Sequence, residues 1–170
     1  ARGLVQAAVG EAGPRPDAVV TDGRLSLGLH RADIASPLPT WVAPSLRARL
    51  AALTDLGVTI DDTRLDDVSL HQALLRDPSG QPLRLLEART FSPPALPAAH
   101  ATQLGYFAEF GLPTLDLERA TAFWDALGFV AFDPVREPFT KVVATGRDLN
   151  VGLYDVDLRR PVLTFSDPAM

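Results

Sequence analysis

The chain has 170 residues, of which 46% are hydrophobic and 22% are charged, a composition typical of one globular domain or of two small ones. Its formal net charge of −5 does not suit a surface that neutralises phosphates, so we expect no nucleic-acid partner. The sequence contains no cysteine, which excludes a disulfide framework, a thiolate metal site and a cysteine nucleophile.

The first half of the chain is predicted to consist of short strands and two helices. Asp22 and Gly23 tolerate the positive φ values of a tight turn, and they therefore separate the two strands of a first hairpin. Asp77-Pro78-Ser79-Gly80 has the composition of a second hairpin turn. The expected elements are a helix over residues 1–9, strands over 18–21, 25–30, 40–42, 58–60, 71–76 and 83–87, and a longer helix after residue 43.

Each half contains a helix whose apolar face follows from the spacing of its residues. The helix of the first half begins at Pro44, whose missing N–H costs nothing in a first turn, and ends at Gly57. The helix of the second half covers residues 115–127, with Asp116 in its first turn and Gly128 at its end. The apolar positions are Leu46, Leu50 and Leu53 in the first helix and Ala120, Phe123, Trp124 and Leu127 in the second.

A proline-rich segment separates the two halves. Residues 91–104 contain three prolines among small residues without periodicity, as in an extended linker, and we expect the domain boundary there. The predicted domains are residues 1–90 and 105–170. Strands are expected in the second domain over 106–112, 139–144, 149–154 and 162–165.

The two halves also share a repeated stretch. Residues 25–46 align without a gap on residues 149–170, at an offset of 124 positions. An ungapped match of this length predicts an internal duplication. The identical pairs are Leu25/Leu149, Gly28/Gly152, Leu29/Leu153, Asp33/Asp157, Pro37/Pro161, Thr40/Thr164 and Pro44/Pro168.

Two segments carry a family resemblance. Residues 115–129, LDLERATAFWDALGF, resemble the first-helix signature of the vicinal oxygen chelate superfamily, which includes glyoxalases, bleomycin resistance proteins and extradiol dioxygenases. Residues 77–87, DPSGQPLRLLE, resemble the closing hairpin of the same superfamily. The resemblance implies an α+β fold of paired βαβββ modules, whose curved mixed sheets form a cup for a ligand.

The resemblance also implies two tandem domains that are each incomplete. Residues 1–90 would lack a first strand, and residues 105–170 would lack the C-terminal helix and the closing strands. We therefore expect the chain to be part of a longer tandem-domain protein. The alternative is a complete chain whose halves complement each other or a dimer partner.

Metal ligands in this superfamily are His and Glu residues on inward-facing strand positions. In the first domain the corresponding positions fall near Leu38 and at Arg84, neither of which suits a cation. In the second domain Glu109 lies seven residues before Asp116, at the place of the first-strand ligand, but the fifth-strand position falls near Val162. Glu109 is thus the single candidate metal ligand, and its alternative role is that of a pocket carboxylate without metal.

Four other residues are candidate ligand contacts. His30 aligns with Tyr154 in the repeat, and both are amphipathic rings that suit a cup, although a half-buried position at a strand end is the more frequent role of such residues. Trp41 lies beside a fifth-strand position, with core packing as its alternative. Arg84, if it points into the first cup, would favour an anionic ligand.

The predicted function is metal-independent binding of a small organic ligand in the sheet cup, with no cofactor. One alternative is a metal-dependent lyase, isomerase or dioxygenase that uses Glu109 together with residues outside this chain. Another is a degenerate scaffold for dimerisation, in which the partner would be a second copy of the same chain. Whether the chain is an enzyme stays open at this point.

No apolar run approaches the roughly 18 to 20 residues of a membrane span, and no signal peptide is recognisable, so we expect no membrane partner and a cytoplasmic location.

Overall fold

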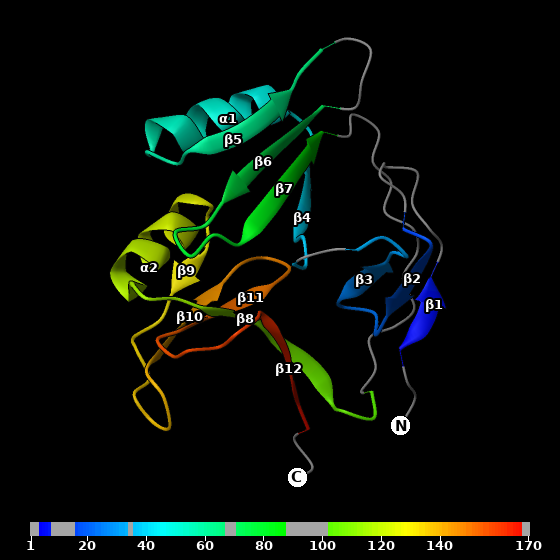
Figure 1. Ribbon diagram of the computed structural model, residues 1–170, viewed down its shortest axis with the longest axis vertical. Coiled ribbons are helices and arrows are strands. Elements are labelled where there is room, and N and C mark those ends of the chain that lie inside the picture. Colours follow the sequence, from blue (N-terminus) through cyan, green and yellow to red (C-terminus); the bar gives the residue numbers. More distant parts are fainter. Residues whose placement is uncertain (1–3, 8–15, 34–35, 67–70, 88–101, 168–170) are drawn as a thin grey trace.

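The computed structural model describes residues 4–7, 16–33, 36–66, 71–87 and 102–167. In these ranges the chain forms twelve strands and two helices, which are organised in three separate sheets (Figure 1). The content of mixed sheets with few helices confirms the predicted α+β class. In the described part of the chain, no helix is both long enough and apolar enough to cross a bilayer.

The first module, residues 40–87, is a complete βαβββ unit. Its sheet has the order β4-β7-β6-β5, in which the first strand is parallel to the last and the others are antiparallel. The parallel pair requires a crossover, which the helix provides. The elements are β4 (Thr40–Ala43), α1 (Leu46–Asp55), β5 (Ile60–Arg64), β6 (Gln72–Arg76) and β7 (Pro82–Glu87).

The second module, residues 106–154, repeats this topology. Its strand order is β8-β11-β10-β9, again with the first and last strands parallel. A further strand, β12 (Val162–Ser166), adds antiparallel to the free edge of β8. The elements of the module are β8 (Tyr106–Pro113), α2 (Leu117–Ala126), β9 (Val130–Ala131), β10 (Lys141–Thr145) and β11 (Asn150–Tyr154).

Both ends of α2 lie where the capping residues in the sequence predict them. Asp116 is the N-cap, and its carboxylate accepts a hydrogen bond from the backbone N–H of Arg119 at 3.0 Å. Gly128 lies just beyond the helix with a φ of +92°, a conformation that costs glycine little. The predicted range 115–127 is therefore correct to within two residues at each end.

The third sheet contains β1 (Val5–Ala7), β2 (Ala18–Thr21) and β3 (Ser26–Leu29). Its hairpin repeats the register of the second module, because Val19 pairs with Gly28 as Val143 pairs with Gly152. The duplication thus extends from sequence to strand pairing. The predicted helix over residues 1–9 is wrong for residues 5–7, because this segment pairs with β2, and tertiary pairing outweighs weak helix propensity.

A single hydrophobic core extends across both modules on the side of the sheets that carries the helices. The predicted stripe of α1 is confirmed, since Leu46, Leu50 and Leu53 are all buried. Trp124 of α2 is fully buried and belongs to the same cluster. Figure 1 shows α1 and α2 on the same side of the molecule, and Arg49 of α1 donates a hydrogen bond to the carbonyl of Leu127 at 2.6 Å.

Candidate ligand-binding site

Three polar side chains meet on the sheet of the second module. Glu109, in the middle of β8, is only 5% exposed. Its Oε1 atom accepts a hydrogen bond from Lys141 Nζ at 3.2 Å and another from the hydroxyl of Tyr154. Lys141 Nζ also lies 3.4 Å from the Tyr154 hydroxyl. We call Glu109, Lys141 and Tyr154 the polar cluster.

Strand alternation places all three residues on the sheet face that does not carry α2, and we call the face of each module's sheet that lies away from its helix the cup face. Successive side chains in a strand point to opposite faces. The residue next to each cluster residue in sequence belongs to the core on the helix side, so the cluster residues point the other way. These neighbours are Phe110 beside Glu109, Val142 beside Lys141 and Leu153 beside Tyr154. Lys141 and Tyr154 are also direct cross-strand partners in the β10–β11 pair, so their side chains lie next to each other.

Two glycines provide the space that the Tyr154 ring occupies. Gly152 and Gly111 are partners in the parallel pair of β11 and β8. A Cβ atom on Gly152 would lie 2.7 Å from Cε2 of Tyr154 and 2.8 Å from Cδ of Glu109. A Cβ atom on Gly111 would lie 3.1 Å from the same ring atom. The ring therefore lies close against the backbone of both strands, and any larger residue would displace it.

The charges of the polar cluster compensate one another. Burial lowers the pKa of Lys141, but the hydrogen bond to Glu109 and its negative charge outweigh this effect and raise the pKa above its ordinary value. Burial, together with the hydrogen bond to Glu109, raises the pKa of Tyr154. At neutral pH Lys141 is thus an ammonium and Tyr154 a protonated phenol, and both act as hydrogen-bond donors.

The polar cluster offers a divalent metal ion a single carboxylate, that of Glu109. A metal site in this fold needs several His or Glu side chains, and the described residues contain no group of three or more His, Cys, Asp or Glu that could hold one. The Glu109 oxygen that would coordinate an ion already bonds an ammonium and a phenol. Val162, at the fifth-strand position, has no donor atom and packs near Gly111 instead.

The structure brings two of the predicted site residues together and keeps three apart from them. Arg84 lies on β7, on the face opposite to α1, where its Nε donates to Thr40 Oγ1 at 3.3 Å and burial lowers its pKa. His30 follows β3 and is exposed. Trp41 lies on the helix side, with its ring edge-on to Trp124 at 6.2 Å, and so packs in the core region rather than on the cup face.

Sequence reasoning missed Lys141, the cation of the cluster. It is the only lysine of the 170 residues, among fifteen arginines. Its place in an otherwise apolar strand, KVVAT, was a usable signal, because an isolated charge there needs a partner. The pairing itself required the strand register, since Lys141 and Glu109 are 32 residues apart.

Comparison with solved structures places the arrangement of the two βαβββ modules in a known fold. A catechol 2,3-dioxygenase matches with a TM-score of 0.60 and 18% identity, over 95% of this chain and 65% of that chain. The fold is that of the vicinal oxygen chelate superfamily. A homoprotocatechuate 2,3-dioxygenase mutant from Brevibacterium fuscum matches with a TM-score of 0.57 and 16% identity, over 90% of this chain and 46% of its own. The Mn(II)-bound glyoxalase from Novosphingobium aromaticivorans has a TM-score of 0.55 and 15% identity, over 95% and 55%.

The likeness concerns fold, at identities of 15 to 18%. The chain spans only 46 to 65% of the length of these three proteins. No protein-family model matches the sequence, and no curated protein sequence does. Because one superfold supports many reactions, function has to be inferred from the polar cluster itself.

Proposed function

We propose that this protein binds a small organic molecule on the cup face of the second module without using a metal ion. The observation that carries the proposal is the ion pair of Lys141 with Glu109. A buried carboxylate needs a compensating charge, and here an ammonium at 3.2 Å supplies it. The strand position that resembles a metal-ligand position is thus neutralised from within the chain.

The chemistry of the face indicates what kind of ligand would suit it. Lys141 keeps 29% of its side chain exposed, and Tyr154 is half-buried, so both donors are within reach of a bound molecule. Val162 beside them is 40% exposed and adds apolar surface. A ligand with an acceptor oxygen and an apolar body would use both features.

The proposal is tested by a screen of small molecules for thermal stabilisation, followed by titration of the hits into variants. Binding to the folded state raises the melting temperature in proportion to the logarithm of ligand concentration. We expect Lys141→Gln and Tyr154→Phe each to weaken binding about tenfold, the effect of losing one charge-assisted or buried hydrogen bond. Arg147→Gln is the matched control, because Arg147 is 94% exposed in a turn. Equal affinity in all variants would contradict the proposal.

The single lysine offers a direct readout of the same site. Labelling of lysine with ¹³C at Cε alone gives one side-chain NMR signal in this chain, that of Lys141. A ligand of the polar cluster should shift this signal. A hit that stabilises the protein without moving the signal binds elsewhere.

A second candidate function is a metal-dependent lyase, isomerase or dioxygenase. It is favoured by the Mn(II)-bound glyoxalase, which shares the fold over 95% of this chain, and by the buried position of Glu109. In that case Glu109 would have to leave Lys141 and join ligands from outside the chain. A metal that binds stoichiometrically and depends on Glu109 would support it.

Arg84 provides a separate expectation for the first module. It lies on the face opposite to α1, where a ligand in the first cup would meet it, and its guanidinium would select an anionic ligand. A homodimer likewise remains a prediction, which sedimentation equilibrium would test.

A further inference from the structure

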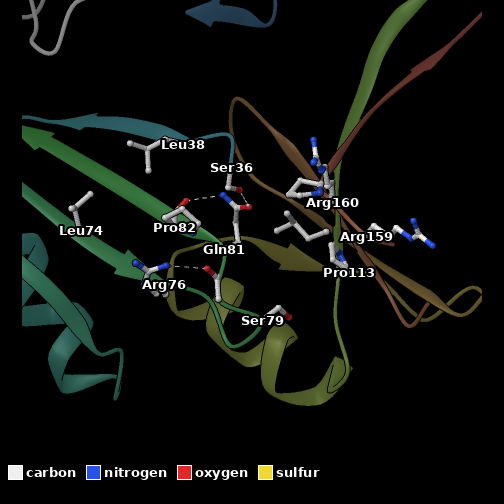
Figure 2. Close-up of a pocket in the computed structure, with 13 residues that line it drawn as sticks. Ser36, Leu38, Leu74, Arg76, Ser79, Gln81, Pro82, Pro113, Arg159 and Arg160 are labelled. Atoms are coloured by element: carbon white, nitrogen blue, oxygen red, sulfur yellow. Dashed lines mark hydrogen bonds between the residues drawn. The ribbon is translucent and has the colours of Figure 1, made fainter. Parts of the chain in front are cut away.

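A cavity of about 520 Å³ lies between the two modules, and none of the polar cluster residues lines it. One wall is the β6–β7 turn of the first module, with Ser79 and Gly80, and the opposite wall is the segment that leads into β12, residues 159–161 (Figure 2). Its volume falls within the range of roughly 300–1,000 Å³ that is usual for small-molecule sites. The cavity is therefore large enough for an organic ligand.

The lining of this cavity carries positive charge only. Arg76, Arg159 and Arg160 line it, and none of the lining residues is acidic. This contrasts with the formal net charge of −5 for the whole chain. A cleft lined by charges of one sign concentrates ions of the opposite sign, so an anion is the ligand that this cavity would attract.

Two of the three arginines have no partner among the described residues. Arg76 pairs with Asp61, from Nε to Oδ2 at 3.0 Å, and also donates to the carbonyl of Gly80 at 3.4 Å. Arg159 and Arg160 are exposed and form no hydrogen bond or ion pair with any residue that the structure describes. Their guanidinium groups are free to engage a ligand, and guanidinium binds carboxylate and phosphate oxygens in a bidentate manner.

The rest of the lining is apolar or already hydrogen-bonded. Gln81 is buried, accepts a hydrogen bond from Ser36 at 2.9 Å and donates to the carbonyl of Pro82 at 2.8 Å (Figure 2). Its amide also donates to the carbonyl of Pro37 at 2.6 Å. Such a network fixes the wall before any ligand arrives. The apolar lining residues are Leu38, Leu74, Pro82, Leu112, Pro113 and Pro161.

We propose that this cavity between the modules is a second binding site, which takes a small organic anion: a carboxylate or phosphate ester with an apolar body. Arg159 and Arg160 are its main charge partners, and Arg76 contributes from the opposite wall. The apolar body lies against the prolines and leucines of both modules. The site is separate from the polar cluster and does not depend on the function proposed for it.

The test uses three probes of similar shape on the ¹⁵N-labelled 170-residue chain: phenyl phosphate, benzoate and the neutral benzamide. We expect phenyl phosphate or benzoate to shift the backbone signals of Ser79, Gly80 and Arg160, and benzamide to bind much more weakly. The double variant Arg159→Gln/Arg160→Gln should weaken anion binding about tenfold or more, since charge-assisted hydrogen bonds are lost. A preference between the two anions identifies which group the site selects.

Two matched controls separate this site from general charge effects and from the polar cluster. Arg136→Gln/Arg147→Gln removes two other exposed charges and should leave affinity within about twofold. Tyr154→Phe should also leave the affinity of the cavity for the anion unchanged, because Tyr154 does not line the cavity. The proposal is overturned if neither anion shifts the signals of Ser79, Gly80 and Arg160 at millimolar concentration, or if benzamide shifts the same signals with equal affinity. It is also overturned if both double variants lose affinity equally, or if only Tyr154→Phe abolishes these shifts.

Discussion

Replacing Lys141 by methionine would leave the buried carboxylate of Glu109 without its cation. The Glu109 side chain is 7% exposed and that of Lys141 is 29% exposed, so the carboxylate could not regain full hydration. Breaking a buried ion pair by removing one partner costs about 3–5 kcal/mol. Tyr154 still donates to the same oxygen, and Lys141 is partly exposed, so we expect a smaller loss of stability than for a fully buried pair, about 2–3 kcal/mol.

A double-mutant cycle isolates this effect from lost packing. Glu109→Gln removes the charge that needs compensation, so Lys141→Met should cost less in that background. The expected coupling is about 1–2 kcal/mol, well above the roughly 0.3–0.5 kcal/mol that independent sites show. Arg147→Met, at a side chain that is 94% exposed, is the control and should change stability by no more than about 0.5 kcal/mol.

The assay is urea unfolding at pH 7, read as midpoint and slope for the wild type, the two single variants and the double variant. Unchanged slopes would show that the variants unfold from a similarly compact state. Purely additive effects of Glu109→Gln and Lys141→Met would refute the reasoning, because they would mean that Lys141 does not compensate the carboxylate.

Three further predictions follow from the same structure. Gly152→Ala places a Cβ atom 2.7 Å from the Tyr154 ring, so we expect it to displace the ring, to lower the free energy of unfolding by about 1–3 kcal/mol and to weaken ligand binding. Burial raises the pKa of Asp22, but hydrogen bonds from the backbone N–H groups of Leu25 and Arg24 outweigh this and lower the pKa below its usual 3.8. Its stabilising contribution is therefore present above that pH and lost as the pH falls through and below it, and urea unfolding in acid should show a shallower pH dependence for Asp22→Asn. Arg84→Ala should weaken the binding of an anionic ligand in the first cup, measured by calorimetry; unchanged affinity together with unchanged stability would contradict that role.

The local elements were predictable wherever short-range chemistry fixes them. Asp22 and Gly23 do separate β2 from β3, and Gly23 has the expected positive φ of 88°. The leucine spacing of α1 identified its buried face, and Trp124 was correctly placed in the core. The duplication was visible as seven identical pairs at a constant offset, and one of these pairs, Gly28 and Gly152, lies opposite a valine in the hairpin of each half.

The assembly of the site was less predictable, because it depends on register over long sequence separations. Glu109 and Tyr154 were both identified, but their contact across 45 residues follows from the parallel pairing of β8 with β11. Lys141 lies in the cluster because it is the cross-strand partner of Tyr154 in the β10–β11 pair. Trp41 was placed beside the cup, whereas strand alternation turns it toward Trp124. The predicted domain boundary at residues 91–104 lies almost entirely outside the described residues and stays a prediction.

The most direct test of the central claim is the metal content of the protein purified without chelator, compared with that of Glu109→Gln. Because Lys141 already neutralises Glu109, the account predicts far less than one divalent ion per chain in both proteins. One ion per chain in the wild type that is lost in Glu109→Gln would contradict metal-independent binding and favour the metal-dependent enzyme.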